Sequence, residues 1–204
     1  MPNIPNEKIV CSPPITLTLK LLAPYIAVIL FWCLLNNGWL AILAYHAQIL
    51  YWQRQSPRER GSLRLSRHCL LVLPFALTGL VAYLSLPRIP GVDLHLWLEA
   101  HHLSRATMLL MIPYFGLLHP PLEQLHWSPL RDRTPLAHLL FAGYHVIVLY
   151  SLLPMVWLLA VFVGLACASC LWQAMEKRSG GLLTPILAHA LADFGIVVAA
   201  VLLS

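Results

Sequence analysis

Charged side chains are scarce in this chain. Only 10% of its 204 residues are Asp, Glu, Lys or Arg, whereas 59% are apolar; a soluble domain carries about 25% charged residues. Apolar runs close to the roughly 20 residues of a membrane-spanning helix recur along the chain. The composition therefore excludes an ordinary soluble domain and predicts an all-α, polytopic transmembrane helical bundle with about six or seven spans.

Cysteine is scarce as well. The five cysteines are odd in number and four lie in or beside apolar runs, which excludes a disulfide framework. Cys167 and Cys170 have the C-x-x-C spacing of redox and zinc sites, but small and apolar residues surround them. This setting favours close helix packing over redox or metal chemistry.

Basic residues outnumber acidic ones, 13 to 8, and they lie mainly in short connections between apolar runs. This placement indicates membrane orientation rather than nucleic-acid binding. The segment 53–68 contains five arginines and one glutamate, and we place this Arg-rich loop in the cytoplasm. Arg131 and Arg133, and later Lys177 and Arg178, are expected in connections on the same side. The chain is thus predicted to be an integral protein of a bacterial inner (plasma) membrane.

Two transmembrane regions are expected, an N-terminal region at 1–103 and a core at 104–204. The first apolar run has no A-x-A-like cleavage site after it and is interpreted as a retained span rather than a signal peptide. The turn at 36–38 predicts two crossings before the Arg-rich loop, with one interrupted helix as the alternative. The predicted spans cover residues 17–35, 39–52, 69–86, 106–126, 135–153, 154–175 and 181–203.

Two acidic residues, Glu123 and Asp193, fall within predicted spans. A charge at the bilayer centre costs about 3 kcal/mol on insertion scales, so an ionisable group kept there is a functional candidate. The alternative is a carboxyl group that is protonated, or paired between helices, and serves packing alone.

His145 and His189 also lie within predicted spans. His189 precedes Asp193 by four residues, so the two side chains share a helix face. Glu123, His145 and His189 are predicted at a common depth, about 12 to 15 Å from the cytoplasmic edge at 1.5 Å per residue. A carboxylate and an imidazole around one water suggest general-base hydrolysis, and a second imidazole can stabilise an oxyanion.

Three short motifs carry these residues: Glu123-Gln-Leu-His-Trp-Ser128, Phe141-x-x-x-His145 and His189-x-x-x-Asp193. In this order they resemble the motifs of CPBP intramembrane proteases, the family of CAAX prenyl endopeptidases and bacteriocin-processing or immunity proteins. The resemblance covers about residues 104 to 203. It implies a protease without a metal or other cofactor, in which Glu123 and His145 activate water. It also implies that His189 and Asp193 form or orient the oxyanion site.

The implied substrate is a membrane-associated peptide or protein, which includes prenylated chains and small peptides. The implied partners are that substrate and the lipid bilayer, with no nucleic acid. The sequence departs from the family at Gln124 and Ser128, where the motif has Glu and Arg. Because both charges are lost together, we interpret the change as compensated and the missing pair as architectural. Trp127 and Tyr144 flank the motifs and are predicted to pack there.

Three alternatives remain open from the sequence. One is a catalytically inactive CPBP-like membrane scaffold or immunity protein, in which the same polar groups hold helices together. Another is a zinc-dependent membrane hydrolase that binds zinc through Glu123, His145 and His189. A haem protein, which needs axial histidines, is the third.

A di-iron site is the least favoured metal reading. His119, Glu123 and His126 have a spacing found in di-iron helical bundles. Pro120 and Pro121 are expected to interrupt that helical turn, and no second Glu-x-x-His or matching carboxylate appears elsewhere in the sequence.

Overall fold

The computed structural model describes residues 14–55 and 69–204, and all regular secondary structure in these ranges is helical. Four helices are long and apolar enough to cross a membrane, which indicates an integral membrane protein and confirms the all-α prediction. They are Ile15–Leu34, Leu70–Arg88, Met155–Ser179 and Leu183–Leu203. Most of the Arg-rich loop predicted at 53–68 lies outside the described residues.

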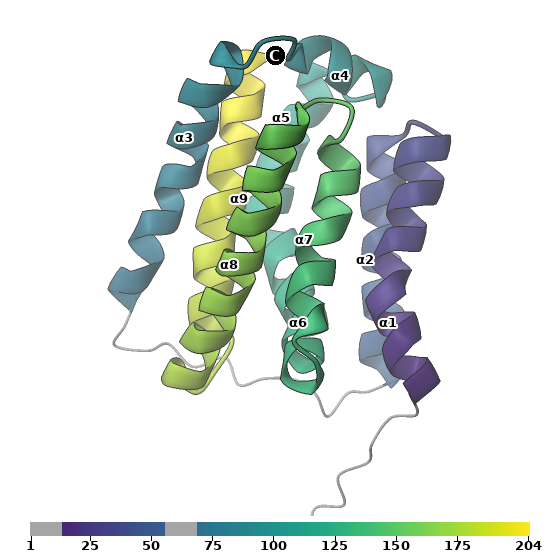
Figure 1. Cartoon of the computed structure of the whole chain (residues 1–204), viewed down its shortest axis with the longest axis vertical. Helices are drawn as coiled ribbons and strands as arrows, with labels where there is room; N and C mark the ends of the chain where they lie inside the picture. The colour runs from purple at the N-terminus through teal and green to yellow at the C-terminus, as the bar shows by residue number, and fades with distance from the viewer. Residues whose placement is uncertain (1–13, 56–68) are drawn as a thin grey trace, which may run out of the picture.

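The described helices run back and forth along the long axis of the molecule (Figure 1). The N-terminal part contains α1 (Pro14–Ala27), the π-helical η1 (Val28–Leu34), α2 (Gly38–Gln55), the 3-10 segment η3 (Cys69–Ala76), α3 (Leu77–Ser85), η4 (Leu86–Arg88) and α4 (Leu94–Ala100). The C-terminal part contains α5 (Arg105–Pro113), the π-helical η5 (Tyr114–Leu118), α6 (His119–Arg133), α7 (Leu136–Leu149), α8 (Met155–Ser179) and α9 (Leu183–Leu203).

The predicted turn at 36–38 separates α1 and η1 from α2. Asn36 adopts a left-handed conformation with φ of 48°, which asparagine tolerates better than most residues. The Asn37 side chain then accepts a hydrogen bond from the backbone N–H of Leu40 at 2.9 Å, as a helix N-cap does. The two helices lie side by side (Figure 1), so this region is a helical hairpin rather than one interrupted helix.

The break predicted at Pro120 and Pro121 does not occur. Both prolines lie in the first turn of α6, where backbone N–H groups have no partner within the helix. Proline therefore removes no hydrogen bond of α6 there. His119 and Glu123 consequently stand one helical turn apart on a continuous face, contrary to the expectation from the sequence.

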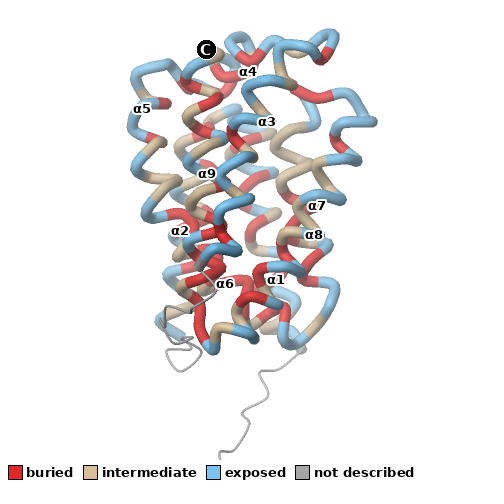
Figure 2. Tube along the Cα trace, turned by 90° about the vertical axis from the view of Figure 1, so that its left-hand side faces the viewer, coloured by how far each residue is buried: buried red, intermediate tan, exposed pale blue. Residues whose placement is uncertain are grey.

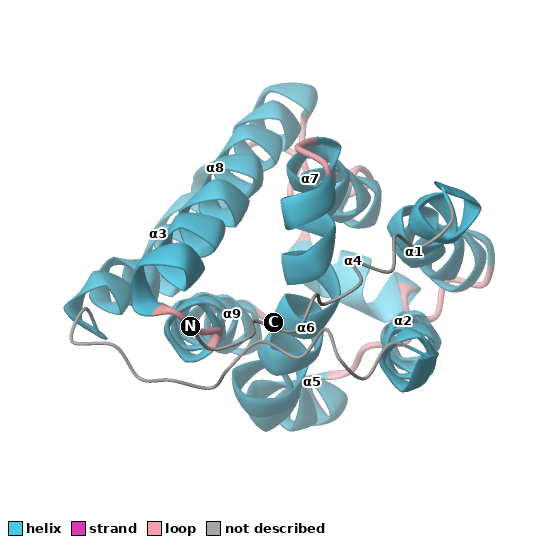
Figure 3. Cartoon of the chain, turned by 90° about the horizontal axis from the view of Figure 1, so that it is seen from below, coloured by secondary structure: helices cyan, strands magenta, loops and turns pink. Residues whose placement is uncertain are grey.

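Helix α6 occupies the middle of the bundle. Viewed from below, α2, α5, α7 and α9 surround it, and α3 and α8 lie toward one side (Figure 3). Most residues of α6 are buried, including Glu123, Gln124, His126 and Arg131. Buried residues gather around this helix in the lower half of the molecule (Figure 2).

The outer helices expose large apolar side chains. Leu70 at the start of the α3 span is 73% exposed, and Met155 of α8 is 79% exposed. Such surfaces are unfavourable in water but match the hydrocarbon of a bilayer. Cys167 and Cys170 of α8 also lie on the exposed surface, so the prediction that they pack between helices is wrong.

Helix α9 is held against α3 by two glycines. A Cβ atom added to Gly79 would lie 2.3 Å from the carbonyl carbon of Gly195, so the two backbones touch. Small residues of this kind let membrane helices approach closely. Because Gly195 follows Asp193 by two residues, this contact also fixes the height of the site residues on α9.

Candidate active site

Glu123 of α6 lies at the centre of the site and is fully buried, with 0% of its surface exposed. Its Oε1 atom accepts hydrogen bonds from the hydroxyl groups of Tyr45 on α2 and Tyr144 on α7. Trp127 Nε1 donates in turn to the Tyr45 oxygen at 2.9 Å, which directs the Tyr45 proton toward Glu123. Three helices therefore fix one oxygen of this carboxyl group.

The second oxygen of Glu123 faces two imidazole rings. Its Oε2 atom lies 3.4 Å from His119 Nε2 and 3.5 Å from His189 Nε2. Among the described residues, Oε2 has no direct hydrogen-bond partner. The arrangement thus presents a buried carboxylate oxygen that can accept a proton, next to two ring nitrogens.

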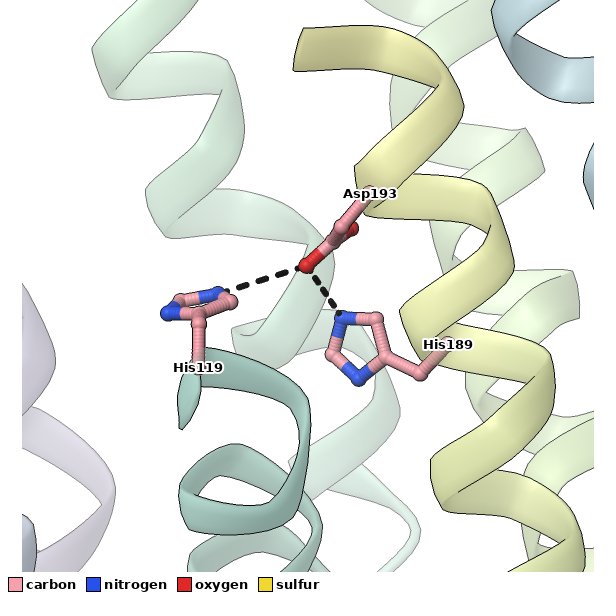
Figure 4. A group of neighbouring side chains, drawn as sticks. All are labelled: His119, His189 and Asp193. Atoms are coloured by element: carbon pink, nitrogen blue, oxygen red, sulfur yellow. Dashed lines mark ion pairs between the residues drawn. The ribbon is translucent and has the colours of Figure 1, made fainter. Parts of the chain in front are cut away.

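Asp193 of α9 joins the same group. Its Oδ2 atom lies 3.2 Å from His189 Nε2 and 3.7 Å from His119 Nε2, between the two rings (Figure 4). The side chains of His189 and Asp193 meet across one helical turn, as their four-residue spacing predicts. Glu123, His119, His189 and Asp193 therefore form one cluster, which we call the carboxylate–histidine cluster.

Residues of α2 and η5 extend this cluster on the far side of His119. His46 Nε2 lies 2.9 Å from His119 Nδ1, and His46 Nδ1 is hydrogen-bonded to the hydroxyl group of Tyr114. The sequence analysis did not single out Tyr45, His46 or Tyr114. A histidine within the apolar run 39–52 was the available signal, because ionisable groups inside a span are functional candidates.

Both aromatic residues predicted to pack do so, and both also form hydrogen bonds. Tyr144 is buried and packs on Trp127 and Phe141, with ring centroids 6.1 and 5.9 Å apart, and its hydroxyl group donates to Glu123. Trp127 is fully buried and packs edge-to-face on Phe141, with ring centroids 5.7 Å apart. It packs as predicted and also supports the hydrogen bond from Tyr45 to Glu123.

His145 of α7 lies beside the cluster. Its ring stacks on Tyr144 with centroids 4.1 Å apart, and its Nδ1–H donates to the Phe141 carbonyl oxygen at 2.8 Å. In the described ranges no ion pair joins His145 to Glu123 or Asp193, which pair with His189 instead. Because Nδ1 carries the proton, Nε2 of neutral His145 keeps a free lone pair that can accept a proton.

A second polar group lies next to the cluster. Arg131 is 3% exposed, and its Nη2 donates to Gln124 Oε1 at 2.6 Å. Ser128 donates to Glu176 of α8 at 2.6 Å, and Arg131 Nη2 lies 4.0 Å from the same carboxyl group. The placement of Arg131 in a connection was wrong, because this residue is buried within α6.

The cluster also contains a possible metal-ligand set. Ligand atoms of His119, His189 and Asp193 all lie within 4.8 Å of one another, and zinc uses such imidazole and carboxylate ligands. The di-iron set proposed from spacing does not form, because His126 turns away and donates to the Lys20 carbonyl oxygen at 3.1 Å.

Comparisons with known proteins add no relative. No protein-family model, no curated protein and no solved structure matches this chain.

Proposed function

We propose that this chain is an intramembrane endopeptidase of the kind that its resemblance to CPBP proteases implies. The observation that carries the proposal is the buried Glu123 carboxyl group, with one oxygen held by two tyrosines and the other facing His119 and His189. A packing role for Glu123 would need only the first set of contacts. The second oxygen, buried and without a direct hydrogen bond among the described residues, is suited to accept a proton from water.

The cluster can divide the reaction between a base and a donor. Glu123 takes a proton from a water molecule, whose oxygen attacks the carbonyl carbon of the substrate. His189 donates a hydrogen bond to the carbonyl oxygen as negative charge develops on it. The C–N bond then breaks, and the proton held by Glu123 passes to the leaving nitrogen. His145, with a free Nε2, is placed to help activate the water, as the resemblance implies.

The membrane arrangement supports a substrate that is also membrane-associated, either a lipidated (for example prenylated) protein or a small peptide. We propose six or seven crossings in a bacterial inner membrane, with the Arg-rich loop 53–68 in the cytoplasm. The C-terminal ends of α2, α6 and α8 lie at the same end of the bundle (Figure 1), as alternating crossings with basic cytoplasmic connections require.

The test is hydrolysis by the full chain in nanodiscs. The probes are membrane-anchored peptides, with and without a prenyl group, in water enriched in oxygen-18. We expect one heavy oxygen in the new carboxyl group of a product, and a loss of rate of at least about 100-fold in Glu123→Gln, since a general base contributes about 10² to 10⁴.

Glu99→Gln is the matched control, because Glu99 is an exposed glutamate on α4 at the opposite end of the bundle. It should leave the rate unchanged. Cleavage that survives Glu123→Gln would refute the assignment of the base. A folded protein that cleaves none of the peptides would favour the inactive scaffold.

A zinc-dependent hydrolase is the second candidate, and a specific observation favours it. The His119, His189 and Asp193 ligand atoms are mutually within 4.8 Å, with Glu123 Oε2 beside both imidazoles. This reading expects about one zinc ion per purified chain and a loss of activity on chelation that added zinc restores.

A further inference from the structure

Gln124 forms a bridge between Arg131 and the carboxylate–histidine cluster. Its Oε1 accepts from Arg131 Nη2 at 2.6 Å, and its Nε2 lies 3.2 Å from His189 Nδ1. All three side chains are at most 3% exposed. Water therefore does not compete for these contacts, and the hydrogen-bonding chemistry of the three groups decides how they are oriented.

Arginine fixes the orientation of the Gln124 amide. A guanidinium group has five N–H donors and no acceptor, so only the oxygen of the amide can face it. The amide NH₂ group must then face His189. This assignment follows from the chemistry of Arg131, whichever way an amide is placed in coordinates.

The amide in turn fixes the protons of His189. An NH₂ group can only donate, so His189 Nδ1 must accept and cannot carry a proton. In the neutral ring the proton then lies on Nε2. The doubly protonated, cationic ring is disfavoured too, because its Nδ1–H would face the amide N–H donors.

We infer that Arg131 and Gln124 are positioning residues that hold His189 as the neutral Nε2–H tautomer, a hydrogen-bond donor directed at the carboxylate–histidine cluster. His189 Nε2 lies on the cluster side of the ring, 3.2 Å from Asp193 Oδ2 and 3.5 Å from Glu123 Oε2. The catalytic meaning of this tautomer rests on the proposed function. The tautomer itself does not.

Two consequences follow for the chemistry of the site. The donor tautomer of His189 complements the opposite tautomer of His145, whose Nδ1–H binds the Phe141 carbonyl oxygen. One imidazole is thus set to donate and the other to accept. An Nε2 that carries a proton also has no lone pair for a metal ion, which argues against zinc bound through His189.

A single isosteric change should reverse the tautomer. In Gln124→Glu, Arg131 keeps the new carboxyl group ionised, and its oxygens can only accept. His189 Nδ1 must then carry a proton. The change alters one atom of the side chain and replaces a buried donor by an acceptor at an unchanged position.

The experiment is nitrogen NMR of the full chain with ¹⁵N-labelled histidine in nanodiscs, with His189 assigned by subtraction of the His189→Gln spectrum. Chemical shifts distinguish protonated from unprotonated ring nitrogens. We expect an unprotonated Nδ1 and a protonated Nε2 in the unaltered chain, and a protonated Nδ1 in Gln124→Glu. A protonated Nδ1 in the unaltered chain would overturn the inference, even if the variant failed to fold. An unchanged His189 signal in folded Gln124→Glu would also overturn it.

Two further variants separate positioning from general structural support. Gln55→Glu makes the same change at an exposed position at the end of α2 and should leave the His189 signals unchanged. Arg131→Met removes the group that orients the amide, so both tautomers of His189 should become populated. Two resolved His189 tautomers in Gln55→Glu, or a single unchanged one in Arg131→Met, would count against the relay.

Activity then distinguishes the inference from the proposed function. If the NMR result holds but Glu123→Gln still cleaves, the proposed function fails and the tautomer stands. If cleavage depends on Glu123 but His189 Nδ1 is protonated, the proposed function stands and the relay fails.

Discussion

Helices α6 and α8 reverse the arrangement of a soluble protein, in which apolar residues lie inside and polar residues outside. Helix α6 carries Glu123, Arg131 and three histidine or glutamine side chains within 15 residues, and most of it is buried. Helix α8 is 25 residues long and mainly apolar, and few of its residues are buried. The polar helix lies inside the bundle, and the apolar helix lies outside.

The comparison teaches which interactions hold this fold together. In lipid, apolar side chains gain little by moving inward, so helices associate through close packing and polar contacts. The polar residues of α6 find hydrogen-bond partners on neighbouring helices in the interior. Glu123 accepts from Tyr45 of α2 and Tyr144 of α7, and Gln124 contacts His189 of α9. The site is thus also a source of helix association, and changes inside α6 should cost more than matched changes on α8.

The largest effect on stability is expected at the contact between α3 and α9, where the backbones of two helices touch. Gly79→Val places a Cβ atom 2.3 Å from the Gly195 backbone, so α3 and α9 must separate. Overpacking of this kind costs about 1–3 kcal/mol, and backbone contact favours the upper end of that range. Gly164→Val on α8 is the control, because no atom lies within 4 Å of its added Cβ. Unfolding in SDS titrations measures both, and equal loss in the two variants would contradict the prediction.

The next prediction compares two arginines near the C-terminal ends of α6 and α8, of which only the buried one should contribute to the free energy of unfolding. Arg131→Met leaves Gln124 Oε1 buried without its donor, which costs about 1–3 kcal/mol. Arg178→Met removes an exposed arginine in the last turn of α8 and should change the free energy of unfolding by less than about 0.5 kcal/mol. The same SDS titration applies. Equal changes in the free energy of unfolding for the two variants would contradict the prediction and would indicate that Arg131 contributes no more than an exposed arginine in a connection.

Contacts within one helix, and contacts between helices at one depth, could be predicted from the sequence. The four-residue spacing of His189 and Asp193 gave their contact, and depth arithmetic brought Glu123 near His189. Both arguments need only the regular rise of a helix. Composition alone indicated an all-helical membrane protein.

Contacts that depend on how distant helices are rotated could not be predicted. Tyr45 and His46 come from α2, and no spacing rule relates their positions to α6. Arg131 was expected in a connection because it follows a predicted span. The rule behind this expectation uses only the position of basic residues along the sequence, so it cannot show that a side chain is buried. His119 was set aside because of Pro120 and Pro121, whose position in a first helical turn depends on where α6 begins.

The smallest effect is expected on the exposed face of α8, in contrast to its buried face. Cys167→Leu adds volume on the exposed face and should change the free energy of unfolding by less than about 0.5 kcal/mol. Ser169, two residues away, is fully buried and its Oγ lies 2.9 Å from His138 Nδ1. Ser169→Leu removes this hydrogen bond and overpacks the contact with α7, so it should cost about 1–3 kcal/mol. A Cys167→Leu variant as unstable as Ser169→Leu would show that Cys167 faces protein rather than lipid, and the inside–outside contrast between α6 and α8 would then fail at this point.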